Sequence, residues 1–414
     1  MDSDLKSSEN ALNGETGNFP RVGIVGTGPS GLMAAYVLAA AGLKVTVFEK
    51  RKSAGRKLLI AGASGLNISY DCEPDIMPEQ YVGNPDFFKK IFAEFSRENW
   101  LAFIHQLGLE TFKGTSRRYF VREMKAANLL RAWQASLKEL GVEFQFGKEL
   151  VDFQASPADR SVTLVFQTGE TAQFAAAGFF LGGGSWEPEE KPLRWPKVFI
   201  EKKLAFQAFE PSNTGFEVAW PEALLKEAEG KPLKNITLTT GRGTKKGELM
   251  ITNYGLEGTP IYAIGQAGQV YLDLKPDLTA PDILAKLNSA KRENLAPIRL
   301  ISKYLNLCEA SLALLFHLST PAHKKDLSQM VALIKKFPIR LNDKRPLDES
   351  ISSSGGLDWA ALTPELMLRN YPGVFAGGEM LNWDTTTGGF LIQACVSQGH
   401  FVGKQMRLYL ESGK

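Results

Sequence analysis

Cysteine is scarce in this sequence: Cys72, Cys308 and Cys395 lie far apart and are odd in number. A disulfide framework is therefore not expected, and the cysteine usage fits a reducing cytoplasm. The absence of any C-x-x-C motif argues against a dithiol–disulfide reductase. The 4 histidines form no cluster with the spacing of metal ligands, so we expect no metal site.

An excess of one charge sign and long apolar runs are lacking as well. The 48 Lys and Arg against 45 Asp and Glu leave a formal net charge of +3, which gives no support for nucleic-acid or membrane affinity. No run approaches the ~20 apolar residues that span a bilayer. Residues 1–18 are polar and lack the features of a signal peptide, so we expect a disordered tail there. The remaining composition is that of a soluble, cytoplasmic protein whose 414 residues form two or three domains.

The most informative stretch is "RVGIVGTGPSGLMAAYVLAAAGLKVTVFEKR" (Arg21–Arg51). It contains, in order, an apolar β-run, a G-x-G-x-x-G motif, a helix-favouring segment and a second strand: 22–25, 26–31, 32–41 and 44–48. The 18 residues from Gly31 to Glu49 are close to the roughly 20 expected before the acid that binds a ribose. The complete pattern predicts a dinucleotide-binding unit rather than a chance glycine-rich turn.

Each part of this unit has a physical role. Gly26 makes the tight turn, Gly28 lets the backbone approach a pyrophosphate, and Gly31 lets the helix pack on the strand. The helix N-terminus brings free N–H groups and a positive dipole end to the phosphate charge. Glu49 can accept hydrogen bonds from both ribose hydroxyls. The predicted binding residues are Gly26, Gly28, Pro29, Ser30, Gly31 and Glu49.

The segment after Glu49 bears on whether the dinucleotide is FAD or NAD. "KRKSAGRKLLIAGASGLNIS" (Lys50–Ser69) combines basic residues with two glycine-rich turns, where a plain NAD domain would proceed to its next helix. Such a loop can return to the pyrophosphate and meet phosphate or flavin oxygens, which favours FAD. A solvated surface loop is the alternative. The candidate contacts are Lys50, Arg56, Lys57, Ser64 and Asn67.

Six motifs occur in order along the chain: "GRKLLIAGASGLNIS", "GTSRRYFVREMKAANLLRAW", "PSNTGFEVAW", "ITNYGLEGTPIYAI", "RPLDESISSSGGL" and "FAGGEMLNWDTTTGGF". Together they resemble the BaiN-like (YhiN-type) bacterial FAD-dependent flavoproteins, from about Arg21 to Gly403, and the last motif is similar to the G-E-M-L-x-W subgroup. The chain departs from the commoner pattern in two places. Gly65-Leu66-Asn67 replaces Arg-Cys-Asn, and "EPEEKPLRWPKVFIEKK" lacks the usual G-S-D-G segment.

The resemblance implies an α/β fold: a glutathione-reductase-like, FAD-binding Rossmann domain that is discontinuous, with an inserted small β-barrel and an inserted helical domain. We expect the FAD domain at 19–190 and 345–414, the barrel at 191–275 and 337–344, and the helical domain at 276–336, after the tail at 1–18. The family implies no single substrate, although a steroid-type enone reductase is proposed for its namesake branch.

Residue patterns in the middle of the chain agree with this architecture. Short strands from about Trp195 to Leu274 predict a small antiparallel barrel or sandwich, and Pro281–Lys336 has helical periodicity. No second G-x-G-x-x-G with a following acid occurs, so no separate NAD(P)H domain is recognisable. Two further cofactor contacts are expected near strand ends, Val151 beside the adenine and Gly183 in "GFFLGGGSWEP"; ordinary turns are the alternative.

The stretch "FAGGEMLNWDTTTGGF" (Phe375–Phe390) is predicted to complete the cofactor site. Gly378 and Glu379 end the last strand of the sheet, where Glu379 can bind a ribityl hydroxyl. Gly388-Gly389-Phe390 begins a helix whose N–H groups would point at flavin N1 and O2. The two ends of the chain are thus expected to form the two halves of one FAD site.

The candidate residues near the substrate belong to less specific sequence patterns than the glycine motifs do. Asn253-Tyr254-Gly255 and Ser352–Gly356 are predicted flavin-facing loops, Gly356 is a predicted cofactor contact, and Tyr254 is the candidate proton donor. Candidate anion or carbonyl contacts are Arg118, Lys125 and Arg345, with ion pairs as the alternative.

These features predict an FAD-dependent oxidoreductase that transfers hydride through flavin N5 to or from a small-molecule substrate, with NAD(P)H as a candidate electron donor. Two alternatives are open at this point. One is a flavin-binding protein whose insertion recognises a macromolecular partner, and the other is a plain NAD dehydrogenase that uses the first motif alone.

Overall fold

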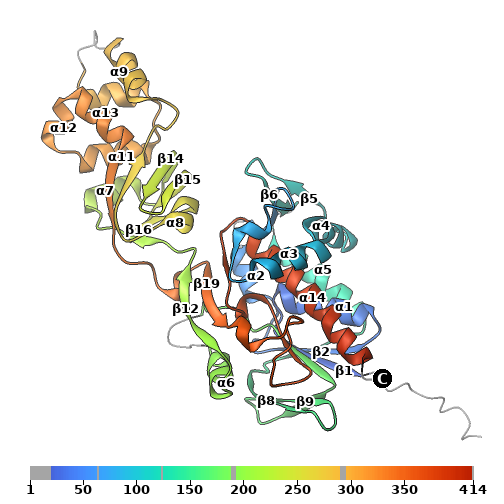
Figure 1. The fold of residues 1–414 in the computed structure, drawn as a ribbon. Helices are drawn as coiled ribbons and strands as arrows, with labels where there is room; N and C mark the ends of the chain where they lie inside the picture. The colour runs from blue at the N-terminus through green and yellow to red at the C-terminus, as the bar shows by residue number, and fades with distance from the viewer. Residues whose placement is uncertain (1–19, 63–64, 123–124, 188–192, 290–294, 413–414) are drawn as a thin grey trace, which may run out of the picture.

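The structure, a computed structural model, describes residues 20–62, 65–122, 125–187, 193–289 and 295–412. The predicted tail at 1–18 and the candidate Ser64 lie outside the described residues. Figure 1 shows two bodies, one built from the early and late segments of the chain and one built from its middle. Within the described residues, no helix combines the length and the apolarity needed to cross a bilayer.

A five-stranded parallel sheet forms the centre of the first body, in the order β20-β11-β1-β2-β7. β1 and β11 are buried along almost their whole length, because both faces of a parallel sheet are covered. β20, which begins the C-terminal motif, pairs with β11 and so lies at one edge. The strands are β1 Arg21–Val25, β2 Lys44–Glu49, β7 Glu143–Phe146, β11 Ala176–Phe179 and β20 Val374–Ala376.

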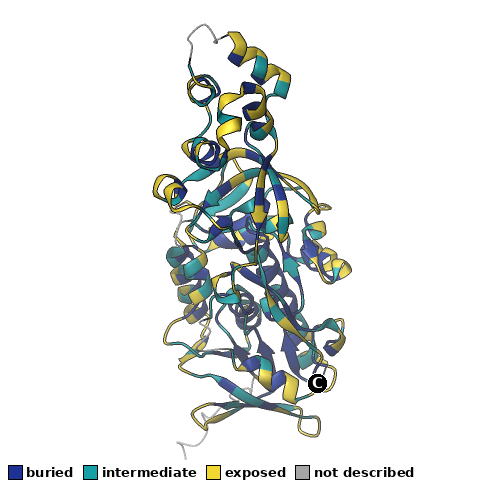
Figure 2. Cartoon of the chain, turned by 90° about the vertical axis from the view of Figure 1, so that its left-hand side faces the viewer, coloured by how far each residue is buried: buried dark blue, intermediate teal, exposed yellow. Residues whose placement is uncertain are grey.

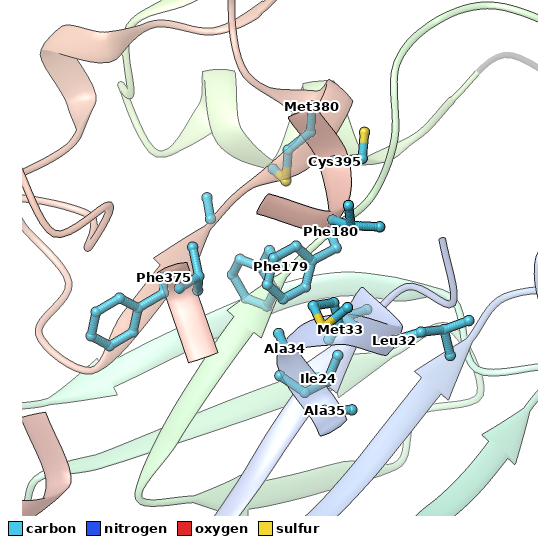
Figure 3. Close-up of a cluster of buried hydrophobic side chains, with 14 of the residues drawn as sticks. Ile24, Leu32, Met33, Ala34, Ala35, Phe179, Phe180, Phe375, Met380 and Cys395 are labelled. Atoms are coloured by element: carbon cyan, nitrogen blue, oxygen red, sulfur yellow. The ribbon is translucent and has the colours of Figure 1, made fainter. Parts of the chain in front are cut away.

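Helices α1 (Pro29–Ala40) and α14 (Phe390–Glu411) pack together on the face of the sheet that Ile24 points toward. They pack at very short range, because a Cβ on Gly399 would lie only 2.2 Å from the Ser30 carbonyl oxygen. Side chains from β1, α1 and the ends of β11 and β20 gather in this core (Figure 3). The opposite face is covered by a three-stranded antiparallel sheet, β8 Leu150–Ser156, β9 Ser161–Phe166 and β10 Thr171–Phe174.

The second body contains a six-stranded antiparallel sheet in the order β13-β16-β15-β14-β17-β18. The chain just beyond β18 returns to β13, where the Asn342 N–H donates to the Glu217 carbonyl at 2.8 Å and the Glu217 N–H donates to the Asp343 carbonyl at 2.9 Å. These bonds close the sheet into the predicted small barrel. Its strands are β13 Phe216–Glu217, β14 Pro232–Thr240, β15 Gly243–Ile251, β16 Gly255–Glu257, β17 Gly268–Asp273 and β18 Phe337–Leu341.

The helices of the second body share one apolar core with the barrel, separate from the core of the first body. They are α7 Glu222–Ala228, α8 Thr259–Ile264, α9 Ala280–Ser289, α10 Pro297–Tyr304, α11 Glu309–Leu318, α12 Pro321–Lys325 and α13 Leu327–Lys335. An antiparallel ladder of β12 (Phe206–Ser212) and β19 (Ser352–Leu357) joins the two bodies (Figure 1). Figure 2 shows buried residues inside both bodies. The exact domain boundaries given above stay predictions.

The other elements surround the parallel sheet. Helix α5 (Ala126–Glu139) buries one face, formed by Leu129, Leu130, Trp133 and Leu137. The remaining elements are α2 Arg56–Ala61, β3 Asn67–Tyr70, η1 Pro78–Gln80, β4 Tyr81–Val82, α3 Pro85–Glu94, α4 Arg97–Gln106, β5 Thr111–Lys113, β6 Arg118–Val121, α6 Trp195–Glu201, η3 Leu347–Glu349, η4 Trp359–Ala361, η5 Gly378–Met380 and β21 Asp384–Thr385.

Candidate cofactor site

In the glycine-rich turn between β1 and α1, two of the three glycines leave no room for a side chain, and the third does. Gly26 has φ +112°, and a Cβ there would lie 2.1 Å from the Phe180 carbonyl oxygen. A Cβ on Gly31 would lie 2.1 Å from the Gly26 carbonyl oxygen. A Cβ on Gly28 would meet no atom within 4 Å. Gly26 and Gly31 are therefore required by the fold itself, whereas Gly28 faces open space at the N-terminus of α1.

That open space belongs to a cavity lined by both ends of the chain. The early part of the lining is formed by Val25–Ser30, Phe48–Arg51 and Gly55–Leu58. The late part is formed by Gly377–Glu379 and by Cys395 of α14. The segments between contribute Lys148–Leu150, Phe180–Gly182, Glu187 and Leu193–Trp195. The cavity thus unites the two motifs that the sequence places more than 340 residues apart.

Glu49 is fixed at the edge of this cavity by the first turn. One of its carboxylate oxygens accepts hydrogen bonds from the N–H of Thr27, at 3.3 Å, and from the Thr27 hydroxyl. The other accepts from the Arg51 N–H at 3.0 Å, and the Thr27 hydroxyl oxygen accepts from the Gly55 N–H at 3.1 Å. A carboxylate offers about four acceptor sites, so Glu49 retains capacity for ribose hydroxyls.

Lys57 and Glu379 meet on either side of Gly183. The Lys57 ammonium donates to the Gly183 carbonyl at 2.7 Å, and the Gly183 N–H donates to Glu379 Oε2 at 3.3 Å. A Cβ on Gly183 would lie 2.7 Å from the Glu379 carboxyl carbon, so only glycine fits between them. Burial lowers the pKa of Lys57, while the charges of Glu379 and Glu187 act in the opposite direction. Predicted contacts from three distant segments are therefore held in one network.

Three buried polar atoms near these elements have no hydrogen-bond partner among the described residues: Glu379 Oε1, Asn67 Oδ1 and Gln398 Nε2. The other side-chain atom of Gln398, Oε1, accepts from the Gly378 N–H at 2.8 Å. Burying an acceptor without a partner costs about 1–3 kcal/mol, so each orphan requires an explanation. Because Glu379 lines the cavity, a ligand with hydroxyl donors would satisfy it, and the residues present fit the ribityl chain of FAD.

The N-terminus of α14 lies outside the lining of this cavity. Gly389 is its N-cap, with φ +106°, and no side chain caps the first turn. A Cβ on Gly389 would lie 2.6 Å from the Ser69 nitrogen, which places this turn against β3, the strand that begins at Asn67. The Phe390 ring stacks on Tyr70 at 4.9 Å between centroids. The structure confirms that a helix begins at Phe390, and its contact with flavin stays a prediction.

Other predicted contacts lie near the cavity without lining it. Val151 follows the lining residue Leu150 at the start of β8. Gly356 has φ +116°, and a Cβ there would lie 2.4 Å from the Met380 carbonyl oxygen, so it packs directly against the Glu379 segment. Cofactor contacts at Val151 and Gly356 stay predictions.

Tyr254 lies in the barrel, away from the cavity. Its hydroxyl donates to Glu257 at 2.7 Å, and the Arg345 guanidinium carbon lies 4.7 Å from its ring centroid. Burial and the Glu257 carboxylate raise the pKa of Tyr254 well above its ordinary value, which makes it a weak acid. Arg345 is itself ion-paired to Glu217 and Glu349, so one of the three candidate anion contacts has carboxylate partners already.

Several residues of the cavity wall were not predicted. Thr27 occupies a variable position of the glycine motif, and Glu187 pairs with Arg51 at 2.8 Å and with Lys50 at 3.3 Å. Cys395 enters from the second turn of α14, and burial raises the pKa of its thiol to about 12, so it is a neutral wall residue. Their roles depend on tertiary contacts, and no sequence pattern marks them. Among the described residues, no group of three or more His, Cys, Asp and Glu is placed to hold a metal ion.

Asp384, which follows Glu379 on β21, gives a pH-dependent prediction. Its Oδ2 accepts from the Ser212 hydroxyl at 2.6 Å, and burial raises the pKa of Asp384 above 3.8, with a further contribution from Glu379. Above pH 3.8 and below its folded-state pKa, the Asp384 carboxyl binds more proton in the folded protein than in the unfolded chain. The contribution of Asp384 to the free energy of unfolding therefore falls as pH rises through this window.

We expect Asp384→Asn to make that fall shallower, as measured by urea unfolding between pH 4 and pH 7. The exposed Asp75, substituted to Asn, is the control and should leave the pH dependence as it is in the wild type. An identical pH dependence in Asp384→Asn and the wild type would contradict this account.

Comparison with known proteins gives a consistent result. The family model described as HI0933-like protein Rossmann domain matches residues 20–405. Ribosomal RNA dihydrouridine synthases of Haemophilus influenzae and Escherichia coli are each 22% identical over 390 residues, covering 89% of this chain and 94% of the relative. The crystal structure of 3-ketosteroid-Δ4-(5α)-dehydrogenase from Rhodococcus jostii matches with TM-score 0.51 and 14% identity, covering 96% of this chain and 98% of that one.

Proposed function

Because this chain belongs to the HI0933-like family of FAD-binding Rossmann oxidoreductases, we propose that it binds FAD in the cavity between its two glycine motifs and uses it to reduce or oxidise a small molecule. The observation that carries the proposal is the buried Glu379 Oε1, which has no hydrogen-bond partner among the described residues and lies in a cavity that both ends of the chain line. A nucleotide held by the first motif alone would not account for the late segment.

The residues divide the cofactor between them. The N–H groups at the start of α1 and the open position at Gly28 would hold the pyrophosphate, and Glu49 the adenosine ribose. Glu379 would accept a hydrogen bond from a ribityl hydroxyl, and the uncapped first turn of α14 would offer its N–H groups to the flavin ring. FAD supplies hydride transfer at its N5 atom when bound. Lys57 and Gly183 orient Glu379, and the apolar core behind α1 and β11 excludes water from this side.

We further propose a carbon–carbon double bond conjugated to a carbonyl as the substrate group and NAD(P)H as a transient electron donor. The names of the two full-length relatives support the first part, since dihydrouridine differs from uridine by two hydrogens across such a bond. The lack of a second G-x-G-x-x-G motif with a following acid supports transient rather than resident nicotinamide.

A second candidate function is the reduction of uridine within an RNA, and the distribution of charge favours it. Residues 216–341 contain 17 Lys and Arg against 12 Asp and Glu, a net charge of +5, whereas the rest of the chain contains 31 against 33. The small net charge of the whole chain, which argued against nucleic-acid binding, is thus the sum of a basic inserted segment and a slightly acidic remainder of the chain. A basic body beside a flavin site suits a polyanionic substrate.

One experiment tests both functions. We expect the purified protein to be yellow and its flavin to bleach when NADH or NADPH is added without oxygen. Enones, quinones and oxygen are then added separately, and we expect the enones to restore the colour. A uridine-containing RNA is tested last, with the same RNA lacking uridine as its control. Recovery with small enones alone would exclude the RNA function. Colourless protein, or flavin that neither nicotinamide reduces, would contradict the proposal as stated.

A further inference from the structure

Arg118 lies where the two bodies touch. It is the first residue of β6, in the sheet β3-β6-β5 of the first body, and it is half-buried. Its Nη2 donates to the hydroxyl of Thr259 at 3.3 Å. Thr259 begins α8, whose Pro260 and Ile261 are buried with the barrel. The side chain therefore connects two bodies that have separate apolar cores.

The guanidinium of Arg118 has no carboxylate within ion-pair distance among the described residues. Its neighbours differ: Arg97 pairs with Asp71 and Glu98, Arg122 pairs with Glu110, and Arg117 lies 3.9 Å from Asp71. A guanidinium carries five N–H donors and cannot give up its charge. Because its one side-chain partner in the described ranges is a neutral hydroxyl, Arg118 keeps donors and a full positive charge for an oxygen acceptor.

The surroundings place this charge beside the first turn of α14, to which the proposed function assigns the flavin ring. A Cβ built on Gly388 would lie 3.4 Å from Arg118 Nε and 3.7 Å from the Tyr70 ring. Gly388 immediately precedes the N-cap of α14, and Phe390 stacks on Tyr70. Gly388 has φ +123°, and any side chain there would crowd the guanidinium. The backbone thus leaves room for Arg118 directly beside the first turn of α14.

We propose that Arg118, supported by Thr259, binds a carbonyl or carboxylate oxygen of the substrate. The location of this contact beside the flavin rests on the function proposed above, whereas the contact itself rests on Arg118 and its partners. An arginine fork suits an oxygen acceptor because two parallel N–H bonds can be made to it. Because Thr259 comes from the inserted body, the insertion contributes to recognition of the substrate.

The test uses the flavin-loaded protein and two small probes, crotonate for a carboxylate and cyclohex-2-enone for a neutral carbonyl. Binding is measured by isothermal titration calorimetry, and the flavin content of every variant is measured from its released FAD. We expect Arg118→Gln to weaken binding of at least one probe by about 10- to 100-fold, the size expected for hydrogen bonds to a charged group. Arg118→Lys should retain part of the crotonate affinity, and Thr259→Val should cause a smaller loss.

Arg122→Gln is the matched control, because Arg122 is exposed, follows β6 directly and pairs with Glu110. It should bind both probes as the wild type does. Equal affinity in Arg118→Gln and the wild type would overturn the proposal, as would an equal loss in Arg122→Gln or no binding of either probe by the wild type. Calorimetry does not depend on turnover, so loss of probe binding with full flavin content separates this inference from the proposed function. Colourless protein would contradict the proposed function alone.

Discussion

Valine in place of Gly28 should leave the protein folded and deprive it of flavin. A Cβ at this position meets no protein atom within 4 Å, so the apo fold has room for the larger side chain. The backbone there has φ −73°, which every L-residue adopts. A pyrophosphate held by the N-terminus of α1 would occupy the same space, and overpacking of this kind costs roughly 1–3 kcal/mol, or about 10- to 100-fold in affinity.

The measurement is the molar ratio of FAD to protein after purification, followed by titration of the apoprotein with FAD. Thermal unfolding of the wild-type apoprotein and of the Gly28→Val apoprotein should give nearly the same midpoint temperature. Gly31→Val is the contrasting variant, because its Cβ would lie 2.1 Å from the Gly26 carbonyl oxygen and the helix could not pack on the strand. We expect that variant to lose its fold as well as its flavin. Wild-type flavin content in Gly28→Val would contradict the placement of the pyrophosphate.

The second large effect is expected from Glu379→Ala, which should lower the affinity for FAD by about 10- to 100-fold, the scale of a lost charge-assisted hydrogen bond. Within the described part of the chain, Glu379 Oε1 is buried without a partner, while Oε2 accepts from the Gly183 N–H. Removing the carboxylate deletes the acceptor proposed for the ribityl hydroxyl. It also leaves the buried Lys57 without one of the two negative charges that raise its pKa.

Glu379→Gln is the matched variant, because it keeps the shape and one oxygen acceptor while it removes the charge. We expect its FAD affinity to lie between those of the wild type and Glu379→Ala, as measured by flavin fluorescence titration of the apoproteins. Glu187→Gln serves as a second control, because Glu187 lines the same cavity but is already ion-paired to Lys50 and Arg51. If Glu379→Ala binds FAD as tightly as the wild type, the late motif does not hold the ribityl chain.

The local parts of the fold could be predicted from the sequence because local rules determine them. Gly26 and Gly31 have the spacing that a strand, a tight turn and a helix require, and these elements form there. The helix that begins at Phe390 follows from the two glycines before it. The resemblance to a flavoprotein family supplied what spacing could not, namely that a barrel and helices interrupt the sheet.

Tertiary contacts could not be predicted in the same way. Thr27 and Glu49 are 22 residues apart, yet their contact depends on the distance between β1 and β2. The contact between Arg118 and Thr259 joins two separate cores, and nothing in either segment alone specifies the other. The resemblance assigned the segment 337–344 to the barrel, but no local pattern specified that Asn342 and Asp343 would pair with Glu217 to close it. Tyr254 does not line the cavity, which could not be predicted because a Tyr-Gly turn has the same pattern at a strand end as at a cofactor.

The edge position of β20 has a consequence for the order of events on the ribosome. β1 emerges more than 340 residues before β20, which at typical synthesis rates of about 5–20 residues per second corresponds to tens of seconds. The last strand of the inserted body ends at Leu341 and β19 ends at Leu357, both before β20, so the body can fold around its own core and bring the ends of β12 and β19 together first, which shortens the loop that β20 must close. Glu379 and α14 arrive after that step, so a nascent chain stalled before residue 374 would display an adenylate pocket unable to retain the flavin. Only chains that have been synthesised as far as the late motif would then bind the cofactor.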